Sequence, residues 1–210
     1  MITILLLGLG AALGACMGLY AHGVTVKEVA SNKRATVFGC AVAGAIGWLA
    51  SAMLSPDLFT APLCGAFFSL LTAVAVIDWR IFEIPNGLNL AILALGAVQL
   101  WLDREHWTLY VIGMFSVSLI FLALWFLTKG NGIGMGDVKL MAAAGLLLGW
   151  PRTLLAMLLG SILGSVIHII RMRGGAGKRL AFGPYLAAGL VLSAWFGNQM
   201  ISAYLGLFGL

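Results

Sequence analysis

Eight apolar runs separated by short polar breaks are the feature that most constrains this chain. They cover residues 2–21, 35–54, 61–78, 87–101, 108–127, 138–150, 152–170 and 184–206. A helix that crosses a bilayer needs about 20 mostly apolar residues, and fewer where neighbouring helices cover its ends. A mean hydropathy of +1.07 and a charged fraction of 9% exclude an ordinary soluble domain. The sequence therefore predicts an all-α, polytopic membrane helix bundle with about eight transmembrane helices.

The junction between the sixth and seventh runs leaves an alternative open. Trp150-Pro151 joins these runs with almost no loop. Proline suits the first turn of a helix, so Pro151 can begin a new one. The alternative is one long helix kinked at the proline, which would give seven spans.

Positive charge predicts how the helices are oriented. With the N-terminus outside, ten Lys and Arg residues fall in the cytoplasmic loops and their helix edges, and only Arg104 and Arg152 fall on the opposite side. Such a positive-inside bias supports eight spans with extracytoplasmic N- and C-termini. The net charge of +5 is then explained by anionic lipid head groups and needs no nucleic-acid partner.

Other sequence features indicate neither a leader nor a metal site. The first run lacks a basic segment before it, so we expect a retained span and not a cleaved signal peptide. The three cysteines, Cys16, Cys40 and Cys64, lie within apolar runs and form no CxxC or Cys/His cluster. Neither a zinc site nor a disulfide framework is predicted.

Two aspartates lie at the boundaries of apolar runs. Asp78 ends the third run, and Asp137 closes Gly134-Met135-Gly136-Asp137 just before the sixth, in a chain with seven acidic residues. An ionisable group at membrane depth is costly and by default marks a functional site. The predicted topology puts both aspartates at cytoplasmic helix ends, so one water-accessible layer can contain them.

Paired carboxylates predict acid–base chemistry on water. Two carboxyl groups brought close together share a proton and titrate as a unit. One group then takes a proton from water while the other donates to the scissile carbonyl oxygen, as in aspartic proteases. Simpler roles also fit the residues: Asp137 as a helix N-cap, and Asp78 as a boundary charge paired with Arg80. Neither explains the glycine-rich segment 129–136, which we expect to line a hydrated cleft.

Three segments together resemble one family. Gly134-Met135-Gly136-Asp137-Val138-Lys139 resembles the GxGD signature of bacterial type IV prepilin peptidases, which are intramembrane aspartyl proteases. Residues 77–86, in which Asp78 is followed by Ile84-Pro85, resemble the other catalytic segment of that family. Residues 180–187 are similar to its C-terminal Phe-Gly-Pro stretch. The resemblance covers the chain from about residue 61 onward.

This resemblance implies a specific activity. Asp78 and Asp137 are expected to be the catalytic aspartates, with supporting roles for the motif residues Gly134, Gly136, Lys139 and Pro85. The expected reaction removes the leader peptide of type IV prepilins or pseudopilins at the cytoplasmic face of a bacterial plasma membrane, without a metal or cofactor. We expect one membrane-embedded peptidase domain over residues 1–210, with two N-terminal helices in 1–60 and the catalytic helices in 61–210.

The segment between the first two helices departs from the family pattern. Many members carry there a cytosolic domain with paired CxxC motifs that methylates the new N-terminus. Only residues 22–34 join these helices here, and no CxxC is present. We therefore expect no methyltransferase activity.

Two other functions remain open at the level of the residues. A small ion-coupled transporter would use the aspartates as a proton or cation relay, and glycine-interrupted helices occur in transporters. Against it, both acids lie at one face, and no pair of inverted halves is visible. A catalytically silent assembly subunit of a pilus or secretion machine is the other alternative.

Overall fold

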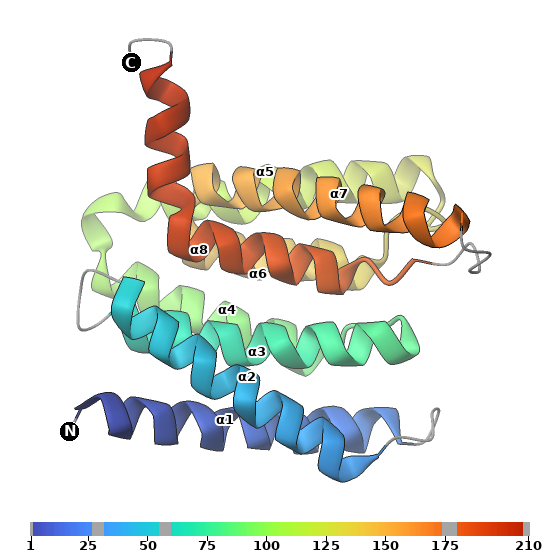
Figure 1. Cartoon of the computed structure of the whole chain (residues 1–210). Helices are drawn as coiled ribbons and strands as arrows, with labels where there is room; N and C mark the ends of the chain where they lie inside the picture. Colours follow the sequence, from blue (N-terminus) through green and yellow to red (C-terminus); the bar gives the residue numbers. More distant parts are fainter. Residues whose placement is uncertain (1, 27–31, 55–59, 174–179, 208–210) are drawn as a thin grey trace. The chain divides into compact units, whose positions relative to one another are not determined.

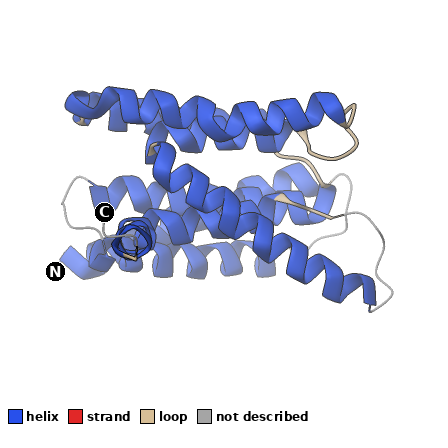
Figure 2. Cartoon of the chain, turned by 90° about the horizontal axis from the view of Figure 1, so that it is seen from above, coloured by secondary structure: helices blue, strands red, loops and turns tan. Residues whose placement is uncertain are grey.

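The computed structural model describes residues 2–26, 32–54, 60–173 and 180–207. These residues form eight α-helices and one short 3-10 helix. Figure 1 labels the α-helices, and Figure 2 shows the helices in blue from above. The predicted all-α membrane helix bundle is therefore confirmed, and six of the eight described helices are long and apolar enough to cross a membrane. The chain divides into two compact units, Met1–Leu88 and Asn89–Leu210. The prediction of a single domain stays a prediction, and each unit is described below by itself.

The first unit contains α1 (Ile2–Thr25), α2 (Lys33–Leu54) and α3 (Thr60–Ile81). Close crossings between α1 and α2 depend on glycine. A Cβ at Gly14 would collide with the carbonyl oxygen of Cys40, and one at Gly44 with that of Gly10. Small residues of this kind bring helix backbones together in membranes, where helices gain little from hydrophobic burial alone.

A tryptophan links α2 to α3. Trp48 is 4% exposed and fills the space left by the missing side chain of Gly65. Its indole Nε1 donates a hydrogen bond to Oγ of Ser69 at 3.2 Å, and that hydroxyl is also buried. The polar edge of the indole is thus satisfied inside an apolar environment, as a buried tryptophan requires.

The second unit contains most of α4 (Asn86–Leu102) and the remaining elements, which are η1 (Arg104–His106), α5 (Trp107–Leu127), α6 (Met135–Leu148), α7 (Trp150–Arg173) and α8 (Gly183–Gly206). Helix α6 lies at its centre and packs against α5, α7 and α8. Gly145 of α6 meets the backbone of Gly113 in α5, and Leu146 of α6 packs on Gly96 of α4.

Helix α6 is short and enclosed. Its 14 residues span about 21 Å, which is less than the roughly 30 Å of a bilayer's hydrocarbon core. Ten of those residues are buried. Because neighbouring helices cover α6, it does not need a lipid-facing surface or a full transmembrane length.

The boundary between α6 and α7 resolves the alternative left open by the sequence. Gly149 separates the two helices with φ 79° and ψ 164°, a conformation that glycine adopts readily and other residues avoid. Helix α7 then begins at Trp150, so Pro151 lies in its first turn. The prediction of two helices is confirmed here, and the single kinked helix is wrong.

The described helices are suited to a membrane. Six of them have the length and hydropathy needed to cross a bilayer, and α4 is a shorter apolar helix. Large apolar side chains are exposed on their outer faces, including Phe38 at 72% and Ile46 at 59%. The chain is therefore a multi-pass membrane protein.

Helix α8 changes direction along its length. Its N-terminal part runs beside α7, and Figures 1 and 2 show its C-terminal part turning across that direction. Arg152, near the start of α7, holds this region. Its Nε donates to Oδ1 of Asn198 at 3.0 Å, and its carbonyl oxygen accepts from Oγ of Ser193 at 2.6 Å. The predicted last span, 184–206, is thus one helix with a bend.

Candidate active site

Asp78 lies in the last turn of α3, where it is 6% exposed. The backbone N–H of Phe82 donates to the carbonyl oxygen of Asp78 at 2.9 Å. Phe82 itself has φ 57°, the left-handed conformation that commonly ends a helix. Such a conformation costs a residue other than glycine about 1–2 kcal/mol. The helix dipole at this end disfavours a negative charge, so a carboxylate here does not serve helix stability.

Arg80 fixes the end of α3 that carries Asp78. Its Nη1 donates to Oγ1 of Thr25 at 3.3 Å, and its Nη2 donates to Oγ1 of Thr36 at 2.7 Å. Thr25 is the last residue of α1 and Thr36 lies in the first turn of α2. One guanidinium group therefore joins the ends of three helices beside Asp78.

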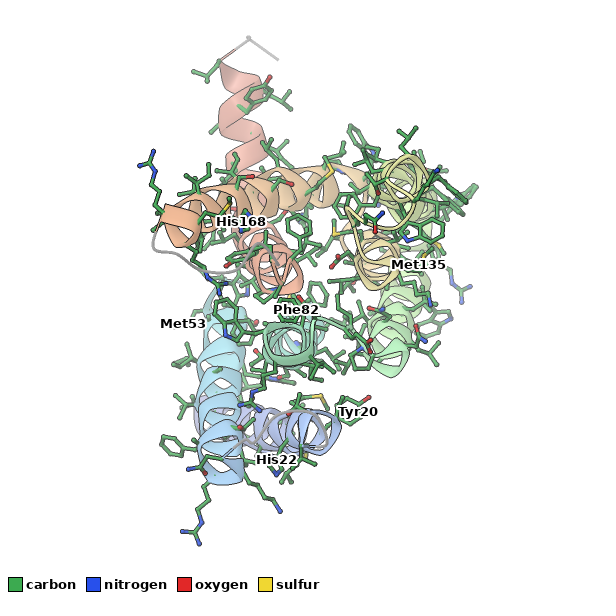
Figure 3. The ribbon with its side chains drawn as sticks, turned by 90° about the vertical axis from the view of Figure 1, so that its right-hand side faces the viewer. Tyr20, His22, Met53, Phe82, Met135 and His168 are labelled. Carbon is green, nitrogen blue, oxygen red and sulfur yellow. The ribbon has the colours of Figure 1, made fainter. Side chains whose placement is uncertain are left out.

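A short connection links Asp78 to α4. Figure 3 shows Phe82 at the end of α3. Ile84 is buried, and Pro85 directly precedes α4, with its carbonyl oxygen accepting from the N–H of Leu88 at 3.1 Å. Pro85 therefore lies immediately before the first residue of the next helix, Asn86. Glu83, in the same connection, is exposed.

Asp137 lies in the first turn of α6 and is 7% exposed. The helix begins at Met135, labelled in Figure 3, and its N-cap is Gly134. The alternative that Asp137 is the N-cap of this helix is therefore wrong. The backbone is already helical before the apolar run starts, and the N–H of Asp137 donates to the carbonyl oxygen of Gly134 at 3.1 Å. A carboxylate in this turn faces the positive end of the helix dipole, which favours a negative charge.

The first glycine of the motif lies against the aspartate. A Cβ built on Gly134 would lie 3.3 Å from Oδ2 of Asp137. That distance is tighter than an ordinary van der Waals contact, so a side chain at position 134 would press on the carboxylate. Glycine at position 134 leaves room for the carboxylate of Asp137, whereas its φ of −73° is open to any residue.

The second glycine of the motif is held by a residue that the sequence analysis did not single out. Nδ2 of Asn89, in α4, donates to the carbonyl oxygen of Gly136 at 3.4 Å. Asn89 is 5% exposed. The only signal in the sequence is a polar residue inside an apolar run, which by itself does not identify a partner 47 positions away. Lys139 is exposed, in contrast to the buried Asp137 two positions earlier.

The structure groups the predicted residues in two places. Asp78 and Pro85 belong to the first unit, and Gly134, Gly136, Asp137 and Lys139 belong to the second. The pairing of the two aspartates stays a prediction of the sequence, because each belongs to a different unit.

Comparisons with known proteins add an independent finding. Residues 65–169 match the type IV leader peptidase family. A protein of Bacillus subtilis called "Prepilin leader peptidase/N-methyltransferase" is 32% identical over 156 residues, which are 72% of this chain and 61% of that protein. A protein of Escherichia coli K12 with the same name is 34% identical over 146 residues, 64% of each chain. Another, from Pseudomonas aeruginosa, is 32% identical over 153 residues, 66% of this chain and 51% of that protein.

The chain spans between half and two thirds of the length of these curated relatives. No solved structure matches it.

Proposed function

Because the chain belongs to the type IV leader peptidase family, we propose that it is an aspartic endopeptidase that removes the leader peptide of type IV prepilins or pseudopilins. One observation carries the proposal. The matched residues 65–169 contain both Asp78 and Asp137, and each is a buried carboxylate at a helix end. Buried carboxylates are costly in a membrane protein, so they indicate a functional site. The reaction of an aspartic endopeptidase requires two carboxyl groups, which Asp78 and Asp137 would supply.

In the proposed reaction, Asp78 and Asp137 act as a pair. One carboxylate is ionised and takes a proton from water, whose oxygen then forms a bond to the carbonyl carbon of the scissile peptide. The other carboxyl group donates its proton to the carbonyl oxygen. When the tetrahedral intermediate collapses, the carbon–nitrogen bond breaks. The carboxyl group that took the proton from water gives it to the leaving amine, and a hydroxyl group of the intermediate returns a proton to the other carboxylate. The pair ends with one shared proton, as it began.

We place this reaction at the cytoplasmic face of a bacterial inner membrane. The support is the distribution of cations, with ten Lys and Arg residues in the loops and helix edges assigned to the cytoplasm and two on the other side. Those cations also favour contact with anionic lipid head groups. Only residues 22–34 join the first two apolar runs, and no CxxC occurs, so we do not expect this chain to methylate the product.

The test is co-expression of the full chain with a tagged prepilin. Asp78→Asn and Asp137→Asn should each reduce leader removal by at least about 100-fold, the scale of a lost general acid or base. Both variants should insert in the membrane at the level of the wild type. Glu83→Gln changes an exposed carboxylate close in sequence to Asp78 and serves as the control that keeps activity.

The product is followed by its gel mobility and by its N-terminal mass. Full processing by either aspartate variant would remove that residue from the mechanism. A wild-type chain that inserts but does not cleave any prepilin would instead favour a silent assembly subunit.

A further inference from the structure

A buried asparagine of α4 contacts the start of α6. Asn89 is 5% exposed, and its Nδ2 lies 3.4 Å from the carbonyl oxygen of Gly136. That carbonyl belongs to the peptide group whose nitrogen is the backbone nitrogen of Asp137. The contact therefore holds the peptide unit immediately before the candidate catalytic aspartate.

The chemistry of this contact determines which way the amide group of Asn89 faces. A carbonyl oxygen only accepts hydrogen bonds, so the NH₂ group must point to Gly136 and the Oδ1 atom must point elsewhere. Oδ1 is buried and has no hydrogen-bond partner among the described residues. Buried acceptors are normally paired with protein, water or ligand, so this oxygen calls for a donor.

The segment that Asn89 holds is a glycine-rich first turn of α6. Gly134 and Gly136 flank Met135, and no side-chain hydrogen bond caps the helix at Gly134. The N–H groups of Asp137 and Val138 bond to the carbonyl oxygen of Gly134 within the segment. Because glycine itself restricts the backbone little, a contact from another helix adds a further restraint on the peptide group before Asp137. Asn89 supplies such a contact from α4.

We propose that Asn89 is a positioning residue of this site, which holds the Gly136–Asp137 peptide group through Nδ2 and receives a main-chain N–H of bound substrate at Oδ1. The second role rests on the proposed function. A peptide presented to the aspartates must be extended around the scissile bond, and its backbone N–H groups then lack helical partners. Oδ1 of Asn89 is a buried acceptor on the residue that contacts the Gly136–Asp137 peptide group, and it would satisfy one of them.

Two substitutions of similar size separate these roles. Asn89→Leu removes both the donor and the acceptor. Asn89→Asp keeps the shape and, when protonated, keeps an O–H donor for Gly136; when ionised, it places a negative oxygen against that carbonyl. Leu90→Ala, at a neighbouring position of α4 that is 66% exposed, is the control. All variants are purified as full chains in the same detergent as the wild type.

Steady-state cleavage of a prepilin is the first measurement. Asn89→Leu should lower kcat about tenfold or more and raise KM, since a misplaced catalytic group and a lost substrate contact both weaken turnover. For Asn89→Asp, the cleavage rate should approach that of the wild type at low pH, where the new carboxyl group is protonated. As the pH rises, the cleavage rate of the variant should begin to fall at a lower pH than that of the wild type. A purely structural defect would not produce such a reversible, pH-dependent recovery. Unchanged kcat, KM and pH profiles in both variants would overturn the proposal.

Hydrogen exchange of the full chain is the second measurement, and it does not depend on activity. Asn89→Leu should speed exchange at the amides of residues 136–138 by about tenfold, while Leu90→Ala leaves them unchanged. Exchange that is equal in all three proteins would overturn the holding role. If the wild type cleaves no prepilin, the proposed function and the substrate-binding role of Oδ1 are both wrong. The holding role of Nδ2 is then judged from the difference in exchange rate between the wild type and Asn89→Leu alone.

Discussion

At the scale of single residues, the close contact between Gly134 and Asp137 gives a physical reason for the first glycine of the motif. A Cβ at position 134 would lie 3.3 Å from Oδ2 of Asp137, so Gly134→Ala must move the carboxylate by a few tenths of an ångström. We expect cleavage to fall about tenfold, because small displacements of a reacting group are costly. Alanine tolerates the extended backbone of Gly134, so the melting temperature should change little.

Gly8→Ala is the matched control for this substitution, because a Cβ at Gly8 meets nothing within 4 Å. The measurement is prepilin cleavage by purified variants, alongside thermal unfolding. Wild-type cleavage by Gly134→Ala would show that the carboxylate does not need the space above this glycine.

Asp103 is a residue whose role depends on pH. Hydrogen bonds from His106 and then Tyr110 lower the pKa of its carboxyl group below the usual value. The resulting stabilisation is present above the ordinary carboxyl pKa of about 3.9 and is lost as pH falls through the lower folded-state value. Because the group is substantially exposed, it amounts to less than about 1 kcal/mol.

Asp103→Asn should therefore melt slightly below the wild type at neutral pH, and the difference should shrink toward zero under acid conditions. Thermal unfolding in detergent between neutral and acid pH measures this. A difference that grows as the pH falls would contradict the assigned cause.

At the scale of elements, the crossing of α5 and α6 positions the helix that carries Asp137. A Cβ at Gly145 would collide with the backbone carbonyl of Gly113. Backbone atoms cannot rotate out of the way, so Gly145→Ala must separate the two helices. Overpacking of this kind typically costs about 1–3 kcal/mol. We expect a lower melting temperature and reduced cleavage, measured on the purified protein.

Gly39→Ala in α2 is the comparison for Gly145→Ala. The added methyl group meets nothing within 4 Å, and alanine favours a helix over glycine. Gly39→Ala should thus be at least as stable as the wild type. If the two variants unfolded at the same temperature, the close crossing would not be limiting for stability.

The helices also show which structural features the sequence patterns could predict. Apolar runs predicted the eight described helices, and six of these have the length and hydropathy of a membrane-spanning helix. They did not predict the helix ends. Helix α3 continues past Asp78 to Ile81, and α6 begins at Met135 instead of residue 138. Hydropathy records where side chains are apolar, whereas a helix ends where its backbone hydrogen bonds end.

The contacts around the candidate site could be predicted only in part. The motif identified Asp137 and its glycines. The hydrogen bonds of Asn89 and Arg80 join residues 47, 44 and 55 positions apart. Such contacts depend on which helices become neighbours and on their rotation, and no local period specifies either.

At the scale of the whole molecule, charge and structure together predict the topology. Asp103 and Arg152 line one cavity, so the end of α4 and the start of α7 lie at the same end of the second unit. Ser202, in the C-terminal part of α8, lines that cavity as well. The positive-inside rule assigns this end to the extracytoplasmic side and Lys129, at the other end of α5, to the cytoplasm.

A membrane-impermeant thiol reagent tests this assignment in intact cells. In a chain whose native cysteines are replaced by alanine, Ser202→Cys should react from outside, and Lys129→Cys should react only after the membrane is permeabilised. The reverse labelling would show that the chain has the opposite orientation in the membrane, with Asp137 at the outer face. Leader removal at the cytoplasmic face would then be impossible, whatever the chemistry of the two aspartates.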